Sequence, residues 1–153
     1  YKRQILDFSS KNNCRLVLPI DAVTADKMSN KADTKESDID NIEEQNMILD
    51  IGKKTLKLIK NEISKSKTVF WNGPLGVFET SPFDRGTVEI AKFISNLTAN
   101  NKIRSFAGGG DTISALDLAR VKDKFSYVST GGGALLELIE GKKLPGLVAL
   151  GIL

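Results

Sequence analysis

Short apolar runs alternate along this chain with longer segments of helical period. The runs 67–71 (KTVFW), 102–107 (KIRSFA) and 125–129 (FSYVS) predict strands, because each is brief and rich in branched or aromatic residues. A fourth run of this kind, 14–20 (CRLVLPI), predicts another strand. The near-continuous apolar character of these runs is typical of parallel strands that are covered on both faces.

The segments between the runs carry apolar residues at helical spacing. They predict helices over 1–13, 53–66, 81–101, 111–120 and 134–141. Ser81 is expected to cap its helix, with Pro82 at the first helical position. The acidic segment 21–44 predicts a solvated loop or a hairpin over the sheet edge, and 142–153 is an apolar tail. Strands that alternate with helices predict an α/β fold with a parallel sheet.

Length and composition narrow the class of protein further. A chain of 153 residues fits one domain, and a net charge of +3 without a dense basic block gives no sign of nucleic acid binding. Cys14 is the only cysteine, so no internal disulfide forms, which fits a reducing compartment such as the cytoplasm. No apolar run reaches membrane length, and the start lacks a secretory leader. Because Tyr1 opens inside a helical pattern without a Met, we expect a piece of a longer chain.

Three of the predicted strands end in glycine-bearing loops. The segment NGPLG follows the first, GGGDT the second and TGGGA the third. Parallel strands all exit at one edge of their sheet, so the loops that begin at Asn72, Gly108 and Thr130 are expected to line one cleft. Glycines let the backbone approach a ligand, and a helix that starts directly after such a loop favours an anion. The alternative is that the glycines only let helices pack against strands.

Each polar residue in these loops has a chemical and a structural interpretation. Asp111 is a candidate ligand for Mg²⁺ beside phosphate oxygens, or an acid that completes a helix N-terminus. Thr112 donates its hydroxyl to a phosphate or caps the helix. Glu79 accepts ribose hydroxyls or is simply an exposed acid before a helix. Asn72 donates to a phosphate or belongs to an ordinary Asn-Gly turn.

Two familiar nucleotide signatures are absent. The chain has no G-x-x-x-x-G-K-[ST] motif, and GGGDTI does not fit G-x-G-x-x-G. The following strand ends at Ser129-Thr130-Gly131 without the acid that a dinucleotide site needs, which counts against a dehydrogenase. Histidine is absent altogether, so imidazole cannot act as a general base.

The segments VLPIDAVTADK, VFWNGPLGVFE, AGGGDT and STGGGALLELIEGKKLPG, in this order, resemble the carboxy-terminal portion of phosphoglycerate kinases. The resemblance runs from about Cys14 to Pro145. It implies a glycolytic, cytoplasmic and monomeric enzyme of two Rossmann-like, three-layer lobes. That enzyme transfers a phosphoryl group between 1,3-bisphosphoglycerate and ADP, giving 3-phosphoglycerate and ATP, with Mg²⁺. It also implies that 1–153 is an incomplete nucleotide-binding lobe.

The resemblance also implies roles for individual residues. Nucleotide binding falls to Asn72, Gly73, Pro74, Glu79, Gly109, Gly110, Asp111 and Thr112, with Asp111 at the metal. The transferred phosphoryl group meets Gly131, Gly132 and Gly133. Gly110 and Gly133 are the catalytic backbone donors, and Thr130 lies at the hinge between the lobes.

Part of the family's site is missing from this sequence. The lobe that binds 3-phosphoglycerate is absent, and so is the GGAKV-like segment that carries a phosphate-binding lysine. Two interpretations therefore stay open. One is a fragment of a phosphoglycerate kinase that is inactive alone, and the other is a stand-alone module that binds a nucleotide or phosphate without transferring it.

Overall fold

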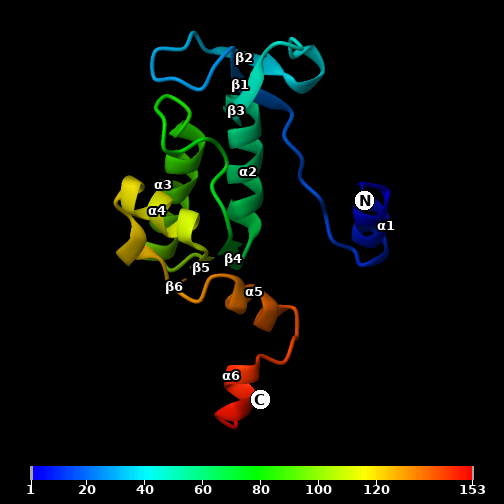
Figure 1. The fold of residues 1–153 in the computed structure, drawn as a ribbon, viewed down its shortest axis with the longest axis vertical. Helices are drawn as coiled ribbons and strands as arrows, with labels where there is room; N and C mark the ends of the chain where they lie inside the picture. The colour runs from blue at the N-terminus through cyan, green and yellow to red at the C-terminus, as the bar shows by residue number, and fades with distance from the viewer. Residues whose placement is uncertain (1, 153) are drawn as a thin grey trace.

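The computed structural model describes residues 2–152 and contains two three-stranded sheets (Figure 1). The antiparallel sheet has the order β2-β1-β3 and the parallel sheet the order β4-β5-β6. The strands are β1 (Asp21–Ala25), β2 (Lys35–Asp38), β3 (Met47–Ile51), β4 (Thr68–Trp71), β5 (Arg104–Gly108) and β6 (Tyr127–Ser129). The helices are α1 (Lys2–Lys11), α2 (Lys53–Lys65), α3 (Arg85–Ala99), α4 (Gly110–Ala119), α5 (Gly133–Ile139) and α6 (Pro145–Ala149), with 3-10 turns η1 (Ile39–Asn41) and η2 (Lys122–Lys124).

The predicted parallel sheet is confirmed. Trp71 pairs with Ala107, and Gly108 pairs with Ser129, so the last residues of β4, β5 and β6 lie side by side. Helices α2, α4 and α5 start close to their predicted positions, whereas α3 starts later than predicted, at Arg85. This order of strands and helices produces the α/β fold that the alternating pattern indicates.

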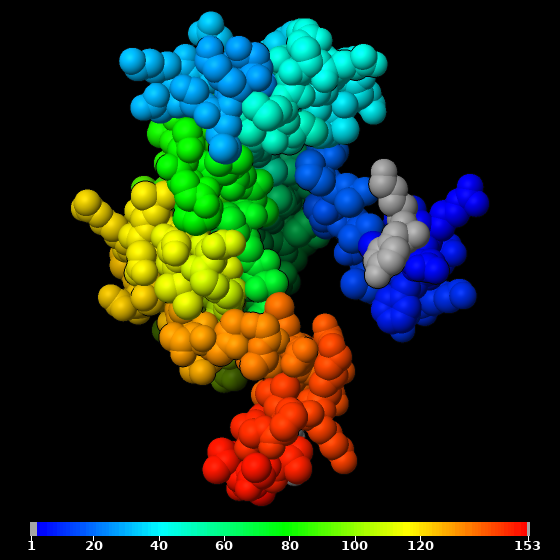
Figure 2. Space-filling model, viewed as in Figure 1, coloured from blue at the N-terminus to red at the C-terminus, as the bar shows by residue number. Residues whose placement is uncertain are grey.

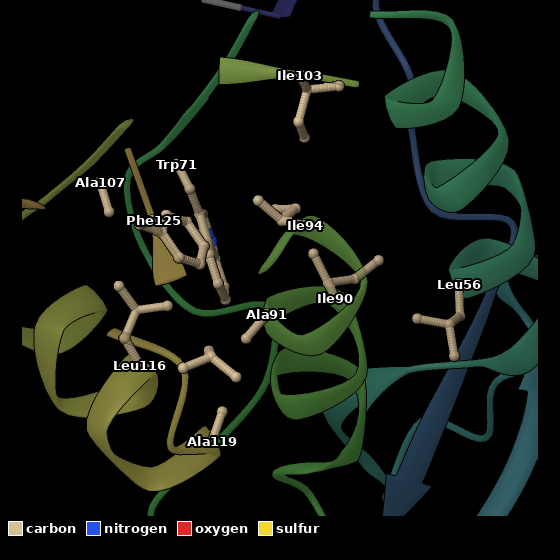
Figure 3. Close-up of a cluster of buried hydrophobic side chains, with 11 residues drawn as sticks. Leu56, Trp71, Ile90, Ala91, Ile94, Ile103, Ala107, Leu116, Ala119 and Phe125 are labelled. Carbon is tan, nitrogen blue, oxygen red and sulfur yellow. The ribbon is translucent and has the colours of Figure 1, made fainter. Parts of the chain in front are cut away.

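The main core lies between the parallel sheet and the helices α2, α3 and α4 (Figure 3). Trp71 and Phe125 pack with ring centroids 6.2 Å apart, and Ile94 and Leu116 beside them are fully buried. The other face of the sheet is less covered than predicted, because Phe70 remains 40% exposed. The expected three-layer arrangement is therefore incomplete in this chain.

The antiparallel sheet is the part of the fold that the sequence pattern misses. Residues 14–20 form no strand and run as an extended connection, in which Leu18 is 59% exposed. The strand β1 begins directly afterwards at Asp21. The acidic segment does form a hairpin, but its first strand β1 is buried at the centre of the sheet, and β3 was not predicted. The polar composition of β1 and β2 hides them from a search for apolar runs, whereas β3 is an apolar run interrupted only by the buried Asp50.

Two buried aspartates of this sheet bind the N-termini of the helices below it. Asp21 accepts hydrogen bonds from the amides of Lys54 (2.8 Å) and Thr55 (2.7 Å) in the first turn of α2. Asp50 accepts one from the amide of Gly86 (2.7 Å) in the first turn of α3. The predicted cap at Ser81 and Pro82 is wrong, because α3 begins only at Arg85 and Asp50 supplies the acceptor from another strand.

The two ends of the chain project from the body of the molecule (Figure 2). Helix α1 carries exposed Ile5, Leu6 and Phe8, and the predicted apolar tail forms the short helix α6. Tyr1, the first residue of the predicted 1–13 helix, lies outside the described residues. Among the helices of residues 2–152, none is long and apolar enough to cross a membrane.

Candidate functional site: one edge of the parallel sheet

The three glycine-bearing loops leave the parallel sheet at the same edge, as predicted. The register places the ends of β4, β5 and β6 next to one another, so Asn72, Gly108 and Thr130 begin neighbouring loops. The loops also touch. A Cβ atom built on Gly109 would lie 3.2 Å from Oδ1 of Asn72, and one on Gly108 would lie 3.2 Å from Cδ2 of Leu135 in α5. The structure therefore brings three segments that are distant in sequence to one place.

Thr112 connects the first two loops directly. Its side chain is buried, and its hydroxyl oxygen accepts a hydrogen bond from the amide of Gly73 at 2.7 Å. This bond joins the start of α4 to the loop after β4. It is a role that neither the phosphate-binding nor the capping interpretation of Thr112 includes.

The N-terminus of α4 is the open end of a helix at this edge. Gly109 precedes it with φ of +97°, a conformation that favours glycine. Within residues 2–152, the amides of Gly110, Asp111 and Thr112 have no acceptor. These free amides and the positive end of the helix dipole favour an anion such as a phosphate.

Asp111 lies exposed in the first turn of α4. No group of three or more His, Cys, Asp or Glu side chains that could hold a metal ion occurs among the residues that the structure describes. A single carboxylate fits Mg²⁺ well when phosphate oxygens supply further ligands, because this ion is usually bound by one or two carboxylates together with substrate phosphates. The donor set therefore fits a metal that arrives with a nucleotide.

The loop after β4 forms one wall of a cavity of about 340 Å³. Pro74, Leu75, Gly76 and Val77 line it on this side, and residues of β1 and β3 line it on the other. Val77 is attached to β3 by a hydrogen bond from its amide to the carbonyl of Leu49 (2.8 Å). The cavity lies between the antiparallel sheet and the loop in which Pro74 was expected to flank a nucleoside.

The remaining predicted residues have fewer contacts. Glu79 is exposed in the turn after Phe78. Thr130 is exposed after β6, and the amide of Gly131 donates to Oγ of Ser129 at 3.1 Å. Gly132 has φ of +50° and precedes α5, which starts at Gly133.

Sequence reasoning missed two contributions to the site. Residues 48–51 of β3 line the cavity, and Thr87 of α3 binds the loop after β4 through its hydroxyl. A run of MILDI before a helix could have predicted β3. Nothing in the sequence around Thr87 distinguishes it from an ordinary helical residue.

Burial and hydrogen bonding shift the pKa values of the two buried aspartates of the antiparallel sheet in opposite directions. Burial raises the pKa of Asp50 to about 6, although the amides of Gly86 and Ile51 donate to it and favour its charged form. Burial also opposes ionisation of Asp21, but hydrogen bonds from the Thr55 hydroxyl and from the amides of Thr55 and Lys54 outweigh it and lower its pKa. Both carboxylates are committed to helix ends and are not available to a ligand.

Comparisons with known proteins agree on one family. A family model described as phosphoglycerate kinase matches residues 1–142. The phosphoglycerate kinase of Chelativorans sp. (strain BNC1) is 49% identical over 148 residues, and that of Xanthobacter flavus is 45% identical over the same length. Each alignment covers 97% of this chain and 37% of the relative.

Solved structures lead to the same result. The structure of phosphoglycerate kinase from Coxiella burnetii superposes with a TM-score of 0.89 at 37% identity, covering 97% of this chain and 37% of that one. The enzyme from Pyrococcus horikoshii OT3 superposes with a TM-score of 0.72 at 30% identity, covering 99% and 38%. The chain thus spans 37% of the length of the curated relatives that it matches. It belongs to the phosphoglycerate kinase family.

Proposed function

We propose that this chain is the nucleotide-binding segment of a phosphoglycerate kinase, which transfers a phosphoryl group between 1,3-bisphosphoglycerate and ADP to give 3-phosphoglycerate and ATP. The observation that carries the proposal is the open N-terminus of α4, placed beside the loop after β4 at the exit edge of a parallel sheet. The alternative of a stand-alone binding module is not favoured, because the relatives are phosphoglycerate kinases.

The proposed nucleotide lies along this edge. Its nucleoside contacts the cavity wall at Pro74, and Glu79 accepts hydrogen bonds from the ribose. Its phosphates meet Asn72, Gly73 and the first turn of α4, formed by Gly109, Gly110, Asp111 and Thr112. The support is the apolar cavity on one side of the loop and the uncapped amides on the other. An apolar pocket next to a few polar groups is the usual form of a small-molecule site.

Asp111 would hold Mg²⁺ together with the phosphate oxygens. The ion, when bound, neutralises the negative charge that the phosphates share during transfer. Gly131, Gly132 and Gly133 face the transferred phosphoryl group, with Gly110 and Gly133 as backbone donors. Thr130 is a proposed hinge residue at the start of this segment.

This site needs no acid or base from the chain. Phosphoryl transfer depends mainly on positioning the reactants and on stabilising the negative charge of the phosphoryl group during transfer. Backbone amides can do both. A site made mostly of glycines, in a chain without histidine, fits that chemistry. The substrate 3-phosphoglycerate needs residues beyond this chain, and we propose a cytoplasmic, monomeric full-length enzyme.

The test is an assay of ATP formation from ADP and 1,3-bisphosphoglycerate by the full-length protein, with and without Mg²⁺. We expect Mg²⁺-dependent transfer. A full-length protein that binds ADP but forms no ATP would contradict the proposal and revive the binding module. The 153-residue chain alone is expected to bind ADP more weakly than micromolar in calorimetry, because it holds part of the proposed contacts. Micromolar affinity would show that this segment suffices.

A further inference from the structure

Three helices of this chain carry a buried threonine at their third residue. Thr55 of α2, Thr87 of α3 and Thr112 of α4 are each at most 1% exposed. Each hydroxyl oxygen accepts hydrogen bonds from the backbone of another segment. Thr55 receives the amides of Ile20 (3.0 Å) and Asp21 (3.1 Å), and these lie at the antiparallel sheet.

The other two threonines bind one and the same loop. Thr87 accepts from the amides of Leu75 (3.0 Å) and Gly76 (3.3 Å), and Thr112 accepts from the amide of Gly73 (2.7 Å). The loop is thus attached at both ends of a four-residue stretch to the first turns of two different helices. Trp71 holds it as well, because its indole N–H donates to the carbonyl of Gly73.

We infer that Thr87 is a positioning residue for nucleotide binding, which it serves by fixing the Leu75–Gly76 backbone that forms the cavity wall. This inference rests on the proposed function. Thr87 does not line the cavity, whereas Pro74, Leu75, Gly76 and Val77 do. It therefore acts through the loop, and the ligand concerned is the nucleoside part of a nucleoside diphosphate or triphosphate.

The surroundings of Gly76 show that this wall of the cavity is closely packed against the protein. A Cβ atom at Gly76 would lie 2.4 Å from Oδ1 of Asp50 and 2.6 Å from the carbonyl oxygen of Phe83. The backbone of Gly76 is therefore pressed against β3 and the segment before α3. Its partly buried amide donates to the Thr87 hydroxyl, as does that of Leu75. Without that hydroxyl, two amides of the wall lose their partner, and the wall is expected to shift.

The test compares Thr87→Val with Thr24→Val in the full-length enzyme. Valine keeps the shape of threonine and removes the hydroxyl in both variants. We expect Thr87→Val to raise KM for the nucleotide about tenfold while kcat and KM for 3-phosphoglycerate change little, as for the loss of uniform binding. Thr24→Val removes an equally buried hydroxyl, which donates to the carbonyl of Lys35 and does not line the cavity, so it should lower the thermal midpoint without changing KM for the nucleotide. Thr87→Ser keeps the hydroxyl and should restore KM.

The outcomes separate the inference from the function on which it depends. Wild-type enzyme that transfers no phosphoryl group would overturn the proposed function. Active wild-type enzyme together with an unchanged nucleotide KM in Thr87→Val would overturn the inference alone. If the valine variant does not fold, Thr87→Ala is used, since it removes the same acceptor with less crowding. A nucleotide KM in that variant equal to wild type would also overturn the inference.

Discussion

Helices α2 and α4 begin in opposite ways, although both follow a strand and a glycine. At α2, Gly52 precedes the helix, and the buried carboxylate of Asp21 fills the space in front of it, 2.2 Å from where a Cβ atom of Gly52 would lie. At α4, Gly109 precedes the helix, and no side chain of residues 2–152 caps its first amides. Helix α3 resembles α2, since Asp50 binds the amide of Gly86.

The difference separates structural helix ends from the candidate functional one. A buried helix N-terminus needs acceptors for its amides, and Asp21 and Asp50 supply negative charge to α2 and α3 from inside the protein. The α4 terminus has an acid too, but Asp111 is exposed and belongs to the helix itself. An end without an internal anion is free to accept one from a ligand. A glycine directly before a helix therefore occurs both at a capped and at an open N-terminus. A carboxylate from a neighbouring strand makes the difference.

The largest expected effect tests the open end. Asp111→Asn in the full-length enzyme keeps the shape and most of the capping capacity but removes the charge, so stability should change little. Turnover should fall on the order of 100-fold, because the charge-neutralising ion is held less well. Turnover measured against Mg²⁺ concentration checks this, and the apparent Mg²⁺ affinity should fall with it.

The control for Asp111 is Asp111→Ala. If Asp111 only caps α4, the alanine variant should lose about 1 kcal/mol of stability while the asparagine variant keeps normal turnover. Normal turnover in Asp111→Asn would rule out the metal role. Thermal midpoints of both variants distinguish a loss of folding from a loss of chemistry.

The next effect tests a closed end. Asp21 accepts hydrogen bonds from two amides and the Thr55 hydroxyl, so Asp21→Asn leaves at least one buried donor without an acceptor. We expect a loss of about 3 kcal/mol in the free energy of unfolding. Because the pKa of Asp21 is lowered, its contribution is present above about pH 4 and is lost as pH falls further. Urea denaturation at neutral pH checks the cost. A loss below about 1 kcal/mol would show that the closed end is not needed.

The sequence predicted the parallel half of this molecule well and the antiparallel half poorly. The strands that lead into Asn72, Gly108 and Thr130 are apolar runs, and their common edge follows from their parallel pairing. The strand β1 contains buried polar residues, Asp21 and Thr24, so its pattern is not that of an apolar run, whereas β3 is an apolar run interrupted only by Asp50. Tertiary hydrogen bonds, such as those of Thr87 and Asp50, decide these features, and no local pattern encodes them.

The smallest expected effect concerns the N-terminus of α3, which Asp50 caps. Burial makes the negative charge of this carboxylate unfavourable. Burial raises the pKa of Asp50 to about 6, so the folded protein binds a proton there more tightly than the unfolded chain. Stability from this group is therefore greater at acid pH and declines as pH rises through about 6.

Asp50→Asn removes this titration. It also replaces one of the two carboxylate oxygens, which accept hydrogen bonds from the amides of Ile51 and Gly86. At about pH 7.5 the substitution removes an acceptor, which is unfavourable, and a buried charge, which is favourable. We therefore expect it to lower the free energy of unfolding by only about 1 kcal/mol. At about pH 5 the wild-type carboxyl is protonated, so the cost should rise by about 1 kcal/mol more. Hydrogen exchange of the first-turn amides of α3 at both pH values measures the difference. A cost that stays constant between the two values would mean that Asp50 is charged throughout, like Asp21, and that the two closed ends are equivalent.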